Sequence, residues 1–129
     1  TNVDGVTVAR GCIGNPFVFG QIRELLAGRP ALRPTMAMVR AALARHWQLA
    51  VPFYGDARRA LPHARMHAIK YGQYHRDPLW ARERLVTMRG PETWDPLVDE
   101  VFADRFDDGR ARELTAADAI VPALQSCSE

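Results

Sequence analysis

The sequence has few of the features that stabilise small secreted proteins or anchor membrane proteins. Two cysteines, Cys12 and Cys127, lie at opposite ends of its 129 residues. Their spacing matches no metal or redox motif, so we expect free thiols in a reducing compartment. No apolar run approaches the roughly 18 residues that suggest a membrane span, and no signal peptide opens the chain. We therefore expect a cytoplasmic protein that has neither a membrane segment nor a metal site.

Segments typical of strands are also scarce. Only residues 6–9 combine alternating β-branched residues with a following glycine turn, which is the pattern of a buried parallel strand. Internal repeats and low-complexity tracts are absent. Hydrophobic residues make up 47% of the chain and are spread along it, which excludes wholesale disorder. The sequence therefore predicts a mainly α fold.

Lysine is nearly absent, and the charge is unevenly distributed. Residues 1–89 carry 14 Lys plus Arg against 5 Asp plus Glu, whereas residues 90–129 carry 3 against 10. All the basic side chains except Lys70 are arginines, the type that binds phosphate through a planar fork, although a GC-rich genome also produces this bias. A basic body of this kind is expected to attract nucleic acid in a salt-dependent way.

Glycines follow the single strand-like segment. Gly11 and Gly14 allow a tight turn and a close approach to the backbone. Asn15-Pro16 then signals a helix start, because Asn caps free N–H groups and Pro fits the first helical turn. Free N–H groups, a helix N-terminus and the guanidinium of Arg10 together suit a phosphate dianion. The alternative is that the glycines only make a tight turn between strand and helix.

The rest of the chain shows helical periodicity between strong start and stop signals. A proline-bracketed linker at residues 29–34 marks a domain boundary. The expected helices are 17–28, 35–55 with a kink at Pro52, 56–75 with a break near Pro62, 77–90, 95–106 and a short one at 114–124.

Three strings carry a resemblance to a known family. Val3-Asp4-Gly5-Val6, Ala9-Arg10-Gly11 and the stretch 14–19 are similar, in order and spacing, to the last strand, phosphate loop and last helix of the barrel in tRNA-dihydrouridine synthases. The stretch 64–71 resembles the Arg-Lys-His helix of the helical domain that follows this barrel. Met66 stands where the family usually has lysine, so no role of that lysine carries over to this chain.

The resemblance implies a fold and a domain organisation. Residues 1–28 would be the last β/α unit of a (β/α)₈ barrel and residues 35–106 a helical bundle that recognises tRNA. The resemblance fades after Phe106, and we interpret residues 107–129 as an acidic extension. A complete barrel needs roughly 200 residues or more, so we expect this chain to be the C-terminal part of such an enzyme. One strand cannot form a sheet, so in this chain alone we expect residues 3–9 to be disordered, helical or paired with another molecule.

The resemblance also implies an activity. The family consists of FMN-dependent oxidoreductases that use NADPH to reduce a uridine in tRNA to dihydrouridine. Ala9, Arg10 and Gly11 match the residues that grip the FMN phosphate. No catalytic residue is expected in this chain, because the family's catalytic cysteine belongs to an earlier barrel loop.

The helix expected at 56–75 is the one that we place against RNA. Its candidate RNA-binding residues are Arg58, Arg59, Arg65, His67, Lys70 and Tyr71. His63 and His67 are four residues apart, as two metal ligands on a helix can be, but no third ligand or nearby glutamate base accompanies them. A polar face towards RNA or the barrel is the favoured interpretation.

Two other functions fit parts of the pattern. A stand-alone helical RNA-binding module would bind tRNA without flavin. Another FMN-dependent barrel oxidoreductase with a helical appendage would act on a small molecule. The sequence does not indicate which uridine would be modified, nor the oligomeric state.

Overall fold

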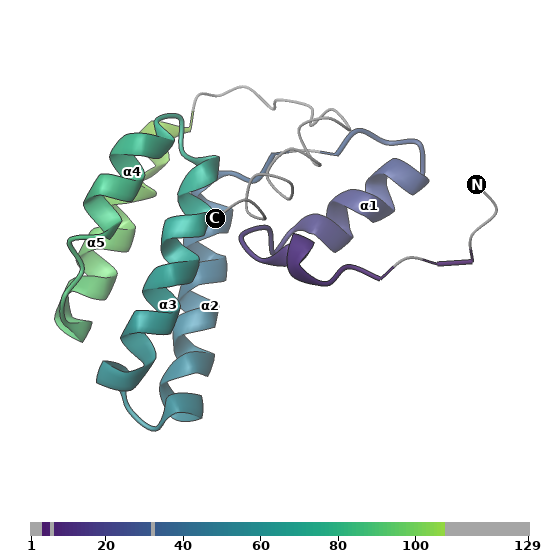
Figure 1. Ribbon diagram of the computed structural model, residues 1–129. Coiled ribbons are helices and arrows are strands. Elements are labelled where there is room, and N and C mark those ends of the chain that lie inside the picture. The colour runs from purple at the N-terminus through teal and green to yellow at the C-terminus, as the bar shows by residue number, and fades with distance from the viewer. Residues whose placement is uncertain (1–3, 6, 32, 108–129) are drawn as a thin grey trace. The chain divides into compact units, whose positions relative to one another are not determined.

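The computed structural model describes residues 4–5, 7–31 and 33–107. The chain divides into two compact units, one of which includes Thr1–Leu32 while the other is Arg33–Ala111. The described residues form helices and turns, in agreement with the mainly α prediction (Figure 1). No helix among them is long and apolar enough to cross a lipid bilayer. The helix expected at 114–124 and the acidic stretch 108–129 lie outside the described residues.

The first unit contains a short 3₁₀ turn, η1 (Arg10–Cys12), and one helix, α1 (Val18–Leu26). Gly14 has a φ of 90°, a left-handed conformation that favours glycine. Asn15 caps the turn that follows, since its Oδ1 accepts a hydrogen bond from the backbone N–H of Phe17 at 3.1 Å. The helix therefore starts at Val18, slightly later than the sequence predicts.

The strand-like segment at residues 6–9 does not form a strand in its described part, as expected for this chain alone. Residues 4–5 and 7–9 are bends or irregular backbone, and Val6 lies outside the description. A strand is stable only when a neighbour completes its hydrogen bonds, and the described residues contain no strand at all. The β-strand preference of valine is therefore not enough to form a strand in this segment.

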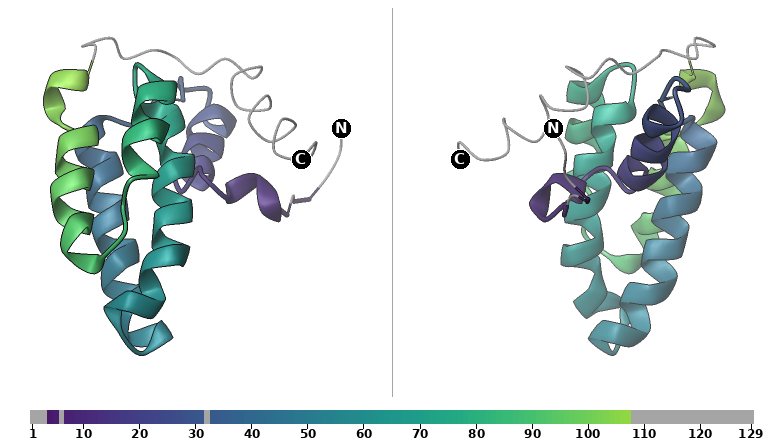
Figure 2. Two further views of the ribbon diagram at one scale, coloured as in Figure 1. Left: turned by 60° about the vertical axis from the view of Figure 1, so that its left-hand side comes forward. Right: turned by 90° about the vertical axis from the view of Figure 1, so that its right-hand side faces the viewer.

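The second unit is a bundle of four helices. They are α2 (Met36–Tyr54), α3 (Ala57–Tyr71), α4 (Pro78–Leu85) and α5 (Trp94–Val101), with the 3₁₀ turns η2 (Gly72–Tyr74), η3 (Pro91–Thr93) and η4 (Asp104–Phe106) after α3, before α5 and after α5. Helix α2 packs against α3 and α5, while α4 packs against α3 and α5. Figure 2 shows α2 and α3 running side by side as a long helical hairpin.

Side-chain caps explain where three of these helices begin. Thr35 accepts a hydrogen bond from the N–H of Met38 at 3.2 Å, Asp56 from that of Arg59 at 2.9 Å and Asp77 from that of Trp80 at 3.0 Å. Each cap satisfies an N–H group that has no partner within the helix. All three starts were predicted from the sequence.

Three of the other boundaries differ from the prediction. Helix α3 ends at Tyr71 and continues as η2, so the stretch up to residue 75 is not one α-helix. Helix α4 ends at Leu85, well before Gly90. Helix α5 begins at Trp94 rather than Asp95.

The prolines inside α2 and α3 do not end either helix. Pro62 lies in the second turn of α3, which continues to Tyr71, and Pro52 lies in the last turn of α2. A proline removes one backbone donor and clashes with the preceding turn, yet the packed bundle holds both helices in place. The predicted break at Pro62 is therefore wrong.

Small side chains bring α2 and α3 close together. Ala60, Ala64 and Ala68 lie four residues apart along α3 and are fully buried. The rings of Trp47 and Trp94 stack with centroids 4.7 Å apart, joining α2 to α5. The core therefore combines small buried side chains on α3 with aromatic stacking between α2 and α5.

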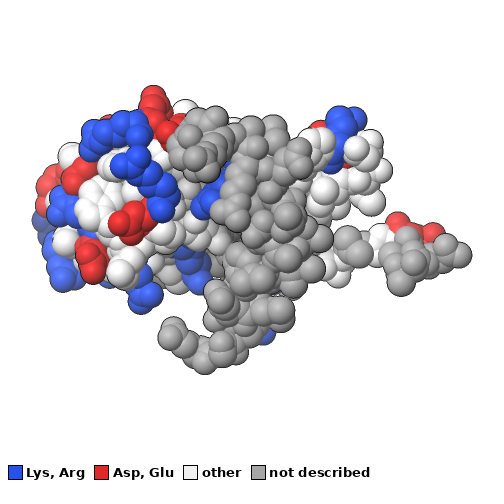
Figure 3. Space-filling view, turned by 90° about the horizontal axis from the view of Figure 1, so that it is seen from above, with Lys and Arg blue, Asp and Glu red and all other residues white. Residues whose placement is uncertain are grey.

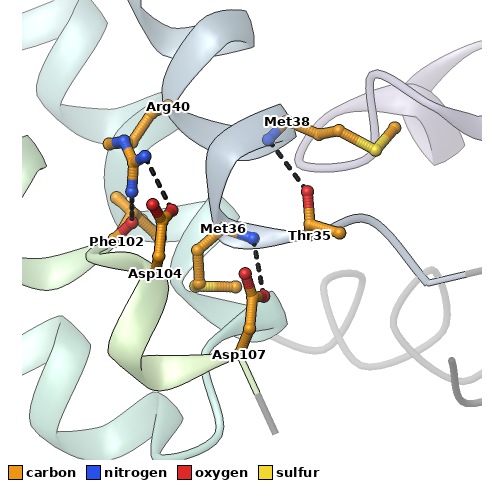
Figure 4. A network of polar contacts seen from close by, with 7 residues as sticks. All are labelled: Thr35, Met36, Met38, Arg40, Phe102, Asp104 and Asp107. Atoms are coloured by element: carbon orange, nitrogen blue, oxygen red, sulfur yellow. Dashed lines mark hydrogen bonds and ion pairs between the residues drawn. The ribbon is translucent and has the colours of Figure 1, made fainter. Parts of the chain in front are cut away.

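The end of the bundle sequence closes onto the beginning of α2 (Figure 4). The backbone N–H of Met36 donates to Oδ1 of Asp107 at 2.8 Å. Arg40 donates to the carbonyl of Phe102 and forms an ion pair with Asp104 at 2.7 Å. Residues 102–107 thus complete the capping of α2 and fix the edge of the unit.

Candidate nucleic-acid interface

The first half of α3 presents exposed basic side chains. Arg58 and Arg59 are both exposed. Arg59 lies 3.6 Å from a carboxylate oxygen of Asp56, a solvent-exposed pair that holds its guanidinium only weakly. Both side chains are therefore accessible to a polyanion.

Arg65, in the middle of α3, is used within the bundle. Its Nη1 donates a 2.9 Å hydrogen bond to the backbone carbonyl of Met88, which is fully buried. This contact joins α3 to the turn after α4. A guanidinium held in this way helps to satisfy a carbonyl beyond a helix end, so Arg65 has a structural role that the sequence pattern alone did not indicate.

His67 belongs to a pair of histidines between α2 and α3. Its ring lies 4.4 Å, centroid to centroid, from that of His46. Burial lowers the pKa of both imidazoles, and the positive charges of His46 and Lys70 lower that of His67 further. Both rings are thus favoured in the neutral form, which suits hydrogen bonding or stacking better than binding a phosphate by charge.

The last two candidates differ sharply in exposure. Tyr71 is buried, with 6% of its surface exposed, and it packs in the core beside Tyr74. Burial also raises the pKa of the Tyr74 hydroxyl strongly. Lys70 is half-buried at the end of α3. Tyr71 therefore supports the helix from inside, whereas Lys70 remains available near the histidine pair.

Aromatic rings near the α2–α3 loop form a feature that the sequence prediction missed. The rings of Tyr54 and His63 stack with their centroids 4.1 Å apart and their planes 1° apart. Phe53 meets Tyr54 edge to face and is 80% exposed. Exposed rings of this kind are platforms on which unpaired bases stack. The signal in the sequence was the Phe-Tyr pair before Gly55.

The cations of the bundle fall into two groups. Several are engaged: Arg84 makes a two-pronged ion pair with Glu100 at 2.9 Å, Arg40 pairs with Asp104, and Arg76 and Arg105 lie over the ring of Phe106. Those that make no ion pair or hydrogen bond through their side chains with another described residue are Arg45, Arg58, Lys70, Arg82 and Arg89. On the bundle face drawn in Figure 3, basic and acidic side chains are interspersed.

The expected phosphate loop forms a short turn with exposed residues. Ala9, Arg10 and Gly11 are all exposed, and Arg10 makes no ion pair within the described residues. The thiol of Cys12 donates to the carbonyl of Ala9 at 3.0 Å, which stabilises the turn. No group of three or more metal-binding side chains occurs in the described part of the chain.

The sequence of this chain matches that of a known family over both units. The family model of dihydrouridine synthase (Dus) matches residues 1–104. The chain belongs to the dihydrouridine synthase family.

The chain is also similar in sequence to curated tRNA-dihydrouridine synthases. The chain is 28% identical over 130 residues, 95% of its length, to a probable tRNA-dihydrouridine synthase of Mycobacterium tuberculosis. It is 34% identical over 105 residues, 79% of its length, to tRNA-dihydrouridine synthase B of Xanthomonas campestris. These matches cover 33% and 31% of the two relatives, so the chain spans about a third of their length. No solved structure matches the chain significantly.

Proposed function

We propose that this chain is the C-terminal part of an FMN-dependent tRNA-dihydrouridine synthase and that it supplies the tRNA-binding bundle of that enzyme. The observation that carries the proposal is the family match, which runs from the first residue through the phosphate loop and the four helices. The net charge of residues 1–89 supports it, since a basic body attracts nucleic acid.

The same proposal assigns the first unit to the cofactor. Arg10 is exposed and free of any carboxylate partner within the described residues, so its guanidinium fits a phosphate. The backbone of Ala9 and Gly11 would lie beside it. FMN would supply the hydride for uridine reduction after its own reduction by NADPH, and this chain's contribution would be to hold the phosphate group.

The proposal assigns different tasks to the six candidates on α3. Arg58 and Arg59 make phosphate contacts, and Lys70 and His67 contact RNA near the His46 ring. Arg65 and Tyr71 keep α3 in position from within the bundle. This division follows the exposure and hydrogen bonds of each side chain.

The first test is binding of tRNA to the purified chain, compared with duplex DNA of equal length over a range of salt concentrations. We expect tighter binding to tRNA, and weaker binding by the double variant Arg58→Ala/Arg59→Ala. Arg82→Ala, which removes an exposed charge from α4, is the control. The proposal would be contradicted if the chain bound tRNA and DNA equally and the double variant bound tRNA as tightly as the control. The binding would then reflect only a basic surface.

The second test is activity. With tRNA, FMN and NADPH supplied, we expect no dihydrouridine from this chain alone, because the residue that protonates the base lies elsewhere in the family's barrel. Measurable product would contradict both the assignment to the C-terminal part and the absence of catalytic residues.

A further inference from the structure

A cleft at the end of the bundle where α3 begins has no role in the proposal above. Its volume is about 370 Å³, and it is lined by Arg58 and Leu61 of α3 and by residues 89–92 between α4 and α5. Arg58 was a candidate in the sequence, whereas nothing in the sequence pointed to Arg89. The cleft brings these two arginines together from segments that are far apart in the chain.

Neither arginine of the cleft is neutralised. Arg58 and Arg89 are exposed and form no ion pair with any described residue, although Glu92 lines the same cleft. Elsewhere in the bundle, Arg40 and Arg84 are paired with carboxylates. Two unpaired guanidinium groups beside one cavity attract an anion, and their planar forks match the oxygens of a phosphate.

The turn that carries Arg89 is fixed before any ligand arrives. The carbonyl of Met88 accepts the hydrogen bond from Arg65 described above. The carbonyl of Gly90 accepts hydrogen bonds from both the backbone N–H and the hydroxyl of Thr93, at 2.9 and 2.6 Å. The backbone of Arg89 therefore lies between two anchored carbonyls, which reduces the backbone entropy lost when its side chain binds a ligand.

The carboxylate in the cleft helps to define the ligand. Glu92 folds back over Gly90, where a Cβ atom would collide with its carboxylate. A carboxylate beside two arginines repels a free dianion more than a singly charged phosphodiester. It also accepts a hydrogen bond from a hydroxyl, and the 2′-hydroxyl is the group that distinguishes RNA from DNA.

We propose that Arg89 and Arg58 bind a phosphodiester of an RNA backbone in this cleft and that Glu92 accepts a hydrogen bond from the adjoining ribose 2′-hydroxyl. The inference rests on the proposed tRNA-binding function and extends it to a site and to two residues, Arg89 and Glu92, that no pattern in the sequence indicated.

The experiment measures binding of the chain to a tRNA transcript and to a DNA strand of the same sequence. We expect Arg89→Ala to weaken tRNA binding about five- to tenfold and to lower the slope of log K against log salt by about one unit. Arg82→Ala is the matched control, because Arg82 is an exposed arginine of α4 that does not line the cleft. Arg89→Lys should restore only part of the affinity. Far-UV circular dichroism confirms that each variant is folded.

Glu92→Ala tests the ribose contact. We expect it to lower the ratio of tRNA to DNA affinity, because it removes the acceptor of the 2′-hydroxyl, which DNA lacks, whereas its repulsion of phosphates acts on both nucleic acids alike. An unchanged ratio would overturn the role of Glu92. Inorganic phosphate, compared with chloride at matched ionic strength, tests for a free-phosphate site. Binding of inorganic phosphate that requires Arg89, together with tRNA binding that does not, would overturn the assignment to an RNA backbone.

The outcomes separate the two proposals. If the unmodified chain does not bind tRNA, the proposed function fails. If it binds tRNA and Arg58→Ala weakens binding, but Arg89→Ala behaves like Arg82→Ala, the function stands and the cleft assignment is overturned.

Discussion

The two halves of α3 have similar compositions but different surroundings. In the first half, Arg58 and Arg59 are exposed, and only a weak surface pair with Asp56 restrains either of them. In the second half, Arg65 is bonded to a buried carbonyl and Tyr71 lies in the core. A basic or aromatic residue in a helix is therefore available for recognition only where the neighbouring elements leave it free. The family-like Arg-x-His string falls mostly in the half that holds the bundle together.

The largest effect expected from this difference is on stability. Arg65→Ala removes the hydrogen bond to the carbonyl of Met88 and should lower the free energy of unfolding by about 1–3 kcal/mol, since a charged donor to a buried acceptor is lost. Arg59→Ala is the control, with an expected change within about 0.5 kcal/mol. Urea unfolding followed by circular dichroism measures both. Equal urea midpoints for Arg65→Ala and Arg59→Ala would contradict a structural role of Arg65.

The second effect concerns RNA binding, which should depend on the first half of α3 rather than on the second. Arg58→Ala should weaken tRNA binding by about 1 kcal/mol and reduce its salt dependence by about one unit. Arg65→Ala, measured at a temperature at which it remains folded, should leave that salt dependence unchanged. If both variants reduce the slope equally, Arg65 contacts phosphate and the two halves of α3 do not differ in the way described.

The smallest effect should appear as a dependence of stability on pH. The pKa values of His46 and His67 are lowered from 6.5 by burial, so the unfolded chain takes up protons at higher pH than the bundle does. The stabilisation that this gives is complete above pH 6.5 and is lost as the pH falls through the lowered values. The double variant His46→Gln/His67→Gln should therefore lose less stability than the parent chain between pH 7.5 and 5.5 in urea unfolding. A parallel loss in both proteins would show that other groups cause it.

Much of the helical architecture was predictable because its signals are local. Thr35, Asp56 and Asp77 cap helices by bonding to residues three positions further along the chain. Gly55, with a φ of 95°, ends α2 as a left-handed glycine does. These features depend on sequence neighbours alone, so a pattern of residue types identifies them.

The errors arose where distant residues decide the outcome. Pro62 remains inside α3 because packing outweighs its local cost. The cleft was not predictable for the same reason, since Arg58 and Arg89 meet only through tertiary packing. Burial of Tyr71 likewise depends on the whole bundle.

The hydrogen bond between Met36 and Asp107 has a consequence for the connectivity of the bundle. It places the start and the end of the bundle sequence within 2.8 Å of each other at these two atoms. A unit with adjoining ends tolerates circular permutation, because a short linker can join them while a new break is made at a surface loop. The loop at Gly55, at the opposite end of α2, is such a place, and opening it would leave the order of helix contacts intact. A permuted bundle should therefore keep the same fold, because the contacts between its helices stay the same while the positions of its chain ends change.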